Sequence, residues 1–72
     1  MNMSVYTDGA CRGNPGVGGW GFYIPSENVA IYGGSIVTTN NKMELTAIAK
    51  ALRYVIDNLS DKVKIVSIHT DS

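Results

Sequence analysis

Apolar residues in the first half of the chain alternate with polar ones or gather with aromatic ones, a pattern typical of β-strands. It covers residues 3–7, 20–24 and 29–37. The stretch between the first two runs is rich in glycine, asparagine and proline, and predicts a loop over residues 9–19. The pair Gly33-Gly34 inside the third run predicts a bulge or a close backbone approach. The connections favour an antiparallel meander of three strands.

The apolar spacing changes to three and four residues from Met43 onward. That spacing predicts an amphipathic helix over residues 42–58, with Asn41 as its N-cap. A last run over residues 63–70 predicts a strand that is apolar on both faces, as expected in the middle of a sheet. A strand that follows a helix usually returns parallel to an earlier strand of the same sheet. We therefore expect one α/β domain over residues 1–72, with a mixed sheet and the element order β-β-β-α-β.

Composition limits the functions that the chain can serve. Six basic and six acidic residues cancel. Phosphate attraction supplies most of the affinity of nucleic-acid-binding proteins, so this chain alone is expected to bind them weakly. No apolar run approaches the roughly 20 residues that span a bilayer, and we expect no membrane association. The single cysteine, Cys11, cannot form an internal disulfide and fits a cytoplasmic location.

Three acidic residues stand at the ends of predicted elements: Asp8 after the first strand, Glu44 in the first turns of the helix, and Asp71 after the last strand. Each has a simple structural explanation when it is taken alone. Asp8 would belong to an Asp-Gly turn, and Asp71 would only end a strand. Glu44 stands three residues after Asn41, which is the spacing of a capping box.

The topology changes the interpretation of these acids. A last strand beside the first brings Asp8 and Asp71 to neighbouring carboxyl ends, where open α/β sheets place their ligands. Glu44 lies on the flank of the predicted buried face of the helix and points toward the sheet. Three clustered carboxylates repel one another unless cations lie between them. The acids therefore predict a site for two Mg²⁺ ions, which take oxygen ligands and support in-line attack on a phosphodiester.

Other features carry less chemistry. Residues 16–21 match the dinucleotide-binding pattern G-x-G-x-x-G, but an aromatic strand follows them where that pattern needs a helix. The sequence also lacks the G-K-[ST] of a P-loop. His69 is expected on a sheet face, on the same side as Asp71. Cys11 has no predicted base beside it that would make it a nucleophile.

Three segments resemble ribonuclease H of the type 1, bacterial and phage-like, class. They are residues 7–16 (TDGACRGNPG), 38–45 (TTNNKMEL) and 70–72 (TDS). They occur in the family's order with the expected elements between them, and the resemblance runs over essentially the whole chain. It implies a ribonuclease H-like mixed sheet of three antiparallel strands, one helix and one parallel strand, incomplete relative to the family fold.

The resemblance implies an endonuclease that hydrolyses the RNA strand of RNA–DNA hybrids with Mg²⁺ or Mn²⁺. Asp8, Glu44 and Asp71 match the family's first three catalytic, metal-binding carboxylates. Amide side chains suit such a substrate because they can donate to and accept from a 2′-hydroxyl, the group that distinguishes RNA from DNA. The positions that match hybrid-binding residues are Asn14, Asn40 and Asn41 at the minor groove, Thr39 at a DNA phosphate, and Gly9 and Cys11 in a loop close to the RNA.

The resemblance covers only the N-terminal half of the family fold. Family members also carry a fifth strand, further helices, a basic substrate-binding region, a loop histidine and a fourth aspartate. Three possibilities remain open. The chain is one half of a ribonuclease H that a second chain completes, or an inactive remnant that binds metal or hybrid weakly, or a non-enzymatic module that assembles through its exposed sheet, for example as a dimer.

Overall fold

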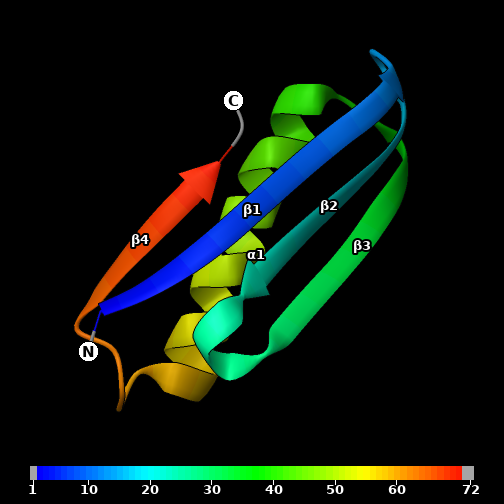
Figure 1. Cartoon of the computed structure of the whole chain (residues 1–72). Helices are drawn as coiled ribbons and strands as arrows, with labels where there is room; N and C mark the ends of the chain where they lie inside the picture. Colours follow the sequence, from blue (N-terminus) through cyan, green and yellow to red (C-terminus); the bar gives the residue numbers. More distant parts are fainter. Residues whose placement is uncertain (1, 71–72) are drawn as a thin grey trace.

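The computed structural model describes residues 2–70 and arranges them as β1-β2-η1-β3-α1-β4 (Figure 1). The elements are β1 (Asn2–Gly13), β2 (Gly16–Ile24), the 3₁₀ helix η1 (Pro25–Glu27), β3 (Val29–Thr38), α1 (Asn40–Leu59) and β4 (Ile65–Thr70). The strands form one sheet in the order β3-β2-β1-β4, in which β1 and β4 are parallel and the other neighbours are antiparallel. This architecture confirms the predicted mixed sheet.

Most of the stretch predicted as a loop, residues 9–19, is strand. β1 and β2 pair along it, and only Asn14 and the cis-linked Pro15 connect the two strands. The glycines that suggested a loop serve close packing instead, since a Cβ at Gly9 or Gly18 would collide with the first turns of α1 or the residues beside them. The prediction was wrong because turns and tight helix–sheet contacts favour the same residue type.

β4 lies beside β1 in a parallel register that runs from Asn2 opposite Ile65 to Thr7 opposite Thr70. The expected return of the chain to the first strand is therefore confirmed. Beyond this ladder, along residues 8–13, β1 has no strand partner on the β4 side within the described residues. β4 is an outer strand of the described sheet and its Ile65 is more than half exposed, so the prediction of a central strand was wrong. Within residues 2–70, no second strand pairs with β4 and would account for its apolar sequence.

α1 begins at Asn40, two residues before the predicted start, and its N-cap is Thr39 rather than Asn41. The Thr39 hydroxyl accepts a hydrogen bond from the Lys42 amide at 3.2 Å. Threonine and asparagine both make good caps, so residue type did not select among neighbouring candidates. The extended backbone of Thr39, directly after β3, makes Thr39 the N-cap. The correction removes Glu44 from the third helical position, which a capping box requires.

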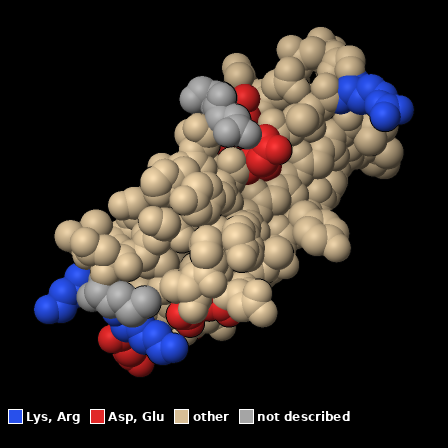
Figure 2. All heavy atoms as spheres, in the orientation of Figure 1, with Lys and Arg blue, Asp and Glu red and all other residues tan. Residues whose placement is uncertain are grey.

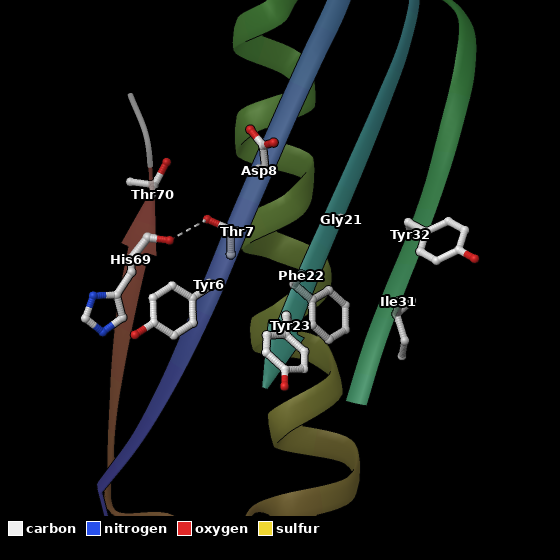
Figure 3. Close-up of a pocket in the computed structure, with 10 residues that line it drawn as sticks. All are labelled: Tyr6, Thr7, Asp8, Gly21, Phe22, Tyr23, Ile31, Tyr32, His69 and Thr70. Carbon is white, nitrogen blue, oxygen red and sulfur yellow. Dashed lines mark hydrogen bonds between the residues drawn. The ribbon is translucent and has the colours of Figure 1, made fainter. Parts of the chain in front are cut away.

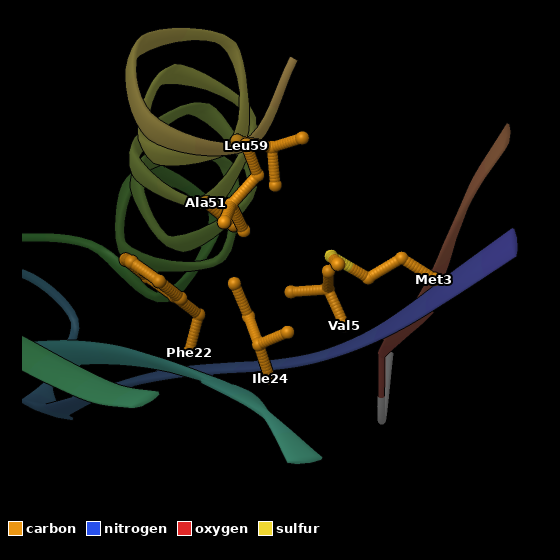
Figure 4. Close-up of a cluster of buried hydrophobic side chains, with 7 residues drawn as sticks. Met3, Val5, Phe22, Ile24, Ala51 and Leu59 are labelled. Carbon is orange, nitrogen blue, oxygen red and sulfur yellow. The ribbon is translucent and has the colours of Figure 1, made fainter. Parts of the chain in front are cut away.

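α1 covers one face of the sheet, and the core lies between them (Figure 4). Alanines at positions 47 and 51 are fully buried and let the helix lie close to the strands. No helix within residues 2–70 is long and apolar enough to cross a membrane. The core cluster consists of buried apolar side chains from β1, β2 and α1: Met3, Val5, Phe22, Ile24, Ala51, Val55 and Leu59.

Gly33 makes room for a side chain rather than for a bulge. A Cβ at this position would fall 2.6 Å from Cζ2 of Trp20, so the indole ring occupies the space that a side chain would need. The irregular register between β2 and β3 lies elsewhere, between Gly16 and Gly18. The Lys50 ammonium lies 5.6 Å from the centroid of the same indole ring, within cation–π range. Trp20 thus joins β3 to α1.

The face of the sheet opposite α1 is uncovered within the described residues (Figure 1). We call it the open face, and the aromatic rings of Tyr6, Tyr23, Tyr32 and His69 are exposed on it. They line a shallow depression of about 410 Å³ together with Asp8. In Figure 2, Lys and Arg lie at the two ends of this face, while its centre is free of them.

Candidate active site

Asp8 lies in β1 at the point where the β1–β4 ladder ends (Figure 3). The last pair of the ladder is Thr7 and Thr70; Thr7 is buried and its hydroxyl donates to the His69 carbonyl oxygen at 3.5 Å. Asp8 is exposed and pairs with Gly21 of β2. Pairing with β2 holds the residue in place, and its exposure leaves its carboxylate accessible to a ligand.

Glu44 reaches the same region from α1. The helix backbone lies against the residue that follows Asp8, because a Cβ at Gly9 would fall 2.5 Å from the Glu44 amide nitrogen. Glu44 is half-buried, in agreement with its predicted place on the flank of the buried helix face. Within residues 2–70 neither Asp8 nor Glu44 has an ion-pair or hydrogen-bond partner. Figure 2 shows acidic atoms gathered over β1 beside the start of α1.

The third predicted carboxylate, Asp71, lies outside the described residues. The described register ends with Thr70 beside Thr7, and the next residues in sequence are Asp71 and Asp8. The topology behind the prediction is confirmed up to this last pair. The catalytic and metal-binding roles of Asp8, Glu44 and Asp71 stay a prediction.

The described acids suit a hard cation in chemical type. No group of three or more His, Cys, Asp or Glu that could hold a metal ion occurs within residues 2–70. Asp8 and Glu44 nevertheless offer carboxylate oxygens, and no Lys or Arg among these residues neutralises them. Mg²⁺ is usually held by one or two carboxylates and completes its shell with water and substrate phosphates. The two described acids therefore fit part of a magnesium site.

Three of the predicted substrate-binding residues are joined by hydrogen bonds at the start of α1. Asn40 Oδ1 accepts from the Cys11 amide at 2.6 Å, and the Asn40 amide donates to Asn14 Oδ1 at 3.2 Å. The Cys11 thiol donates to the Thr38 carbonyl oxygen at 3.2 Å. These bonds connect the β1–β2 hairpin to the junction of β3 and α1. We call Cys11, Asn14 and Asn40 the amide cluster.

The amide cluster determines which polar atoms remain for a ligand. The backbone N–H partners of Asn14 and Asn40 can only donate, so the bonded atom of each side chain must be Oδ1. Both residues are exposed and keep Nδ2, which is a donor only. Sequence reasoning treated these amides as donors and acceptors alike. It missed the restriction because the bonds join residues 26 and 29 positions apart, and no local signal in the sequence marks them.

The other predicted substrate-binding residues have different surroundings. Thr39 uses its hydroxyl to cap α1. Asn41 is exposed on the first turn of the helix. Gly9 is part of β1 and lies against α1, not in a loop. Contacts of these residues with a hybrid stay predictions.

The whole chain, residues 1–72, matches the sequence model of the RNase H family. The ribonuclease H of Saccharopolyspora erythraea is 50% identical over 72 residues, which are 97% of this chain and 44% of the relative. The ribonuclease H of Rickettsia typhi is 50% identical over 70 residues, which are 94% of this chain and 43% of the relative. The chain thus spans less than half the length of these curated relatives.

Solved structures share the fold of this region. The crystal structure of LC11-RNase H1 in complex with RNA/DNA hybrid has a TM-score of 0.83 at 32% sequence identity, over 97% of this chain and 54% of that chain. RNase H1 from Halobacterium salinarum has a TM-score of 0.74 at 29% identity, over 100% of this chain and 55% of that chain. The family match along the full chain and the shared strand order agree, and this chain therefore belongs to the ribonuclease H family.

Proposed function

We propose that this chain carries three of the four catalytic carboxylates and part of the hybrid-binding surface of a ribonuclease H, which hydrolyses the RNA strand of RNA–DNA hybrids. The observation that carries the proposal is the relation between Asp8 and Glu44. These two carboxylates have no partner within residues 2–70 and stand on touching backbone segments where the β1–β4 ladder ends. Accessible carboxylates in such a place can hold divalent cations against a phosphodiester backbone.

The amide cluster supports a duplex with an RNA strand as the substrate. The Nδ2 groups of the exposed Asn14 and Asn40 can donate to the acceptors of a minor groove, which are base N3 and O2 atoms and the oxygen of a 2′-hydroxyl. Such contacts need no positive charge, and the formal net charge of this chain is zero. One structural neighbour is an RNase H1 in complex with an RNA/DNA hybrid, which supports the same substrate class here.

We assign cation binding to Asp8, Glu44 and Asp71, in keeping with the family resemblance. Mg²⁺ or Mn²⁺, when bound as a pair, supplies activation of the attacking water and stabilisation of the leaving oxygen. The chain itself holds the ligands in place. β1 positions Asp8 through its pairing with β2, and α1 positions Glu44 through its contact with Gly9. Because Asp8 is exposed, a phosphodiester can reach its carboxylate from solvent.

We also propose that catalysis requires a complementing half. The chain spans 44% of the Saccharopolyspora erythraea relative. Tyr6 and Tyr32 on the open face are 48% and 82% exposed. An aromatic surface without cations at its centre suits an apolar segment of the remaining fold, supplied by a second chain. The family resemblance implies that this half also brings a fourth carboxylate.

The open face also favours a second candidate function. An uncovered aromatic face beside an outer strand promotes association between proteins. The chain would then be a non-enzymatic module that binds metal or hybrid weakly and assembles through Tyr6, Tyr23, Tyr32 and His69. Catalytic activity after completion of the fold separates the two functions.

A chimera tests the proposal, with residues 1–72 of this chain in place of the matched part of the Saccharopolyspora erythraea enzyme. We expect it to cleave the RNA strand of a labelled RNA–DNA hybrid in Mg²⁺ and to leave duplex DNA intact. We expect the 72-residue chain alone to be nearly inactive in the same assay. Asp8→Asn should lower the rate at least about a hundredfold, since a loss of roughly 3 kcal/mol of transition-state stabilisation has that effect. Asp61→Asn, in an exposed turn after α1, is the matched control.

Each contrary result has its own meaning. A folded chimera that binds the hybrid without cleaving it would reject the enzymatic proposal in favour of the module. Equal rates for Asp8→Asn and the parent chimera would reject the carboxylate assignment. Robust cleavage by a monomeric 72-residue chain would show that no complementing half is needed.

A further inference from the structure

At Gly9, β1 lies directly against the backbone of α1. A Cβ built on Gly9 would lie 2.5 Å from the Glu44 amide nitrogen and closer still to the carbonyl group of Met43. Real Cβ atoms essentially never lie within 3.0 Å of such atoms. All three colliding atoms belong to the helix backbone, so no rotation of a side chain can make room.

The requirement for glycine at this position comes from space and not from backbone conformation. Among the glycines of the described chain, only Gly13 has a positive φ, +75°. Gly9 sits in the regular β1–β2 ladder opposite Trp20. A larger residue could adopt its backbone angles without strain, and the obstacle is the position of α1 alone.

The contact joins the two acids of the candidate active site. Gly9 directly follows Asp8 in β1, and the backbone that it touches is that of Glu44. Any side chain at position 9 must move the start of α1 away from β1 by an amount on the order of an ångström. Mg²⁺ demands near-ideal octahedral geometry, and a displacement of this size at a reacting centre can cost about a hundredfold.

We propose that Gly9 is a positioning residue: it lets the α1 backbone lie against β1 and so sets the separation of the Asp8 and Glu44 carboxylates, which would hold a divalent cation. This inference rests on the proposed function, because it assumes that these two acids share a cation. Gly9 contributes no ligand of its own. It would act on metal binding through the position of Glu44 relative to Asp8.

Other sites in the chain provide matched controls. Gly19 lies in the neighbouring strand, and a Cβ there would meet only the Gly33 carbonyl oxygen, at 3.4 Å. Met43 lies in the same turn of α1 as Glu44, and its side chain packs against Gly18 of β2. Met43→Ala would weaken helix packing without adding an atom between β1 and α1. Comparing Met43→Ala with Gly9→Ala therefore distinguishes a loss of stability from a change in the spacing of Asp8 and Glu44.

The test is a Mn²⁺ titration of the 72-residue chain, followed by paramagnetic broadening of its amide resonances, with urea unfolding on the same samples. We expect Gly9→Ala to weaken Mn²⁺ binding at least about tenfold, and Gly19→Ala and Met43→Ala to keep the parent affinity. In a Glu44→Gln background, Gly9→Ala should change the affinity no further. Its cost in stability should be the same in both backgrounds, because the packing clash does not involve the carboxylate.

The outcomes separate the inference from the proposed function. Glu44→Gln with unchanged Mn²⁺ affinity would reject the shared cation site and the inference with it. Weak binding by Glu44→Gln but normal binding by Gly9→Ala would reject the inference alone. Should Gly9→Ala unfold the short chain, the titration is repeated in the chimera. Unfolding there as well would assign Gly9 to packing only and overturn the proposal.

Discussion

The ring of Tyr6 stacks on the imidazole of His69, with 4.6 Å between ring centroids and 18° between ring planes. The two residues are direct neighbours in the parallel register of β1 and β4. On the face toward α1, the Thr7 hydroxyl reaches the His69 carbonyl oxygen. β1 and β4 are thus joined by side-chain contacts on both faces, immediately before Asp8.

The stack should contribute measurably to stability. His69→Ala in the 72-residue chain is expected to lower the free energy of unfolding by about 0.5–1.5 kcal/mol, the value of an aromatic pair beyond its buried area. His69→Phe should retain most of it. Ser67→Ala, exposed on the same strand, is the control. Urea unfolding compares the three variants, and equal losses for His69→Ala and Ser67→Ala would show that the stack contributes nothing.

The N-cap of α1 gives a second prediction. Thr39→Ala should destabilise the fold by about 1 kcal/mol, because the Lys42 amide loses its acceptor. Thr39→Ser should be close to neutral. Asn41→Ala should cost less than Thr39→Ala, since Asn41 already lies within the helix. Thermal unfolding followed by far-UV circular dichroism decides between the two caps; a larger loss for Asn41→Ala would contradict the Thr39 assignment.

Glu44 should matter for chemistry and little for folding. Glu44→Gln in the chimera is expected to abolish hybrid cleavage and to change stability by less than about 0.5 kcal/mol, because the side chain has no partner within residues 2–70. Glu27→Gln, which loses an ion pair with Lys62 at 3.4 Å, should leave cleavage unchanged. Cleavage rates and melting temperatures of both variants test this. Full activity of Glu44→Gln would make the catalytic assignment wrong.

The amide cluster predicts a separation of folding from substrate binding. Asn40→Asp keeps an oxygen for the Cys11 amide but replaces the Nδ2 donor with a negatively charged oxygen. We expect the chimera with Asn40→Asp to remain as stable as the parent within about 0.5 kcal/mol. It should bind hybrid at least about tenfold more weakly. The lost neutral hydrogen-bond donor and the new repulsion between the carboxylate and the hybrid together exceed about 1.4 kcal/mol. Asn40→Ala should lose both properties. Fluorescence anisotropy with a labelled hybrid measures binding, and undiminished affinity of Asn40→Asp would contradict the donor role.

The open face predicts concentration-dependent association of the 72-residue chain. Tyr32→Lys should shift the chain toward monomer in sedimentation experiments, because it places a charge on the exposed aromatic surface. Ile56→Lys, at a residue 62% exposed on α1, should leave association unchanged. Identical sedimentation of all three proteins as monomers would exclude the open face as an interface.

A chain carrying the remaining part of a relative should raise the melting temperature of the 72-residue chain by mass action.

Topology could be predicted from this sequence because it follows from periodicity and from the general behaviour of crossovers. The change of period at Met43 predicted the helix, and the apolar run after it predicted a strand parallel to β1. Together they place Asp8 at the end of the ladder with β4. These features depend on many residues at once, and a single atypical residue does not change them.

The details of the site were not predictable in the same way. Gly9 suggested a turn, although it is a strand residue that makes room for α1. Thr39 and Asn41 have nearly equal propensity for an N-cap, and the end of β3 decided between them. The bond between Cys11 and Asn40 joins residues 29 positions apart. In each case the deciding contact is tertiary, and one residue type serves two local structures.

The pairing of β1 with β4 has a consequence for the order in which the molecule assembles. β1, β2 and β3 can pair as successive hairpins as soon as they are synthesised, whereas the bond between Thr7 and His69 joins residues 62 positions apart. In a nascent chain β1 therefore pairs with β2 early. The edge of β1 that later pairs with β4 stays unpaired until residue 70 has left the ribosome. During that interval the strand that carries Asp8 is an exposed edge, open to pairing with other chains. This late contact between β1 and β4 is the one that delimits the proposed active site.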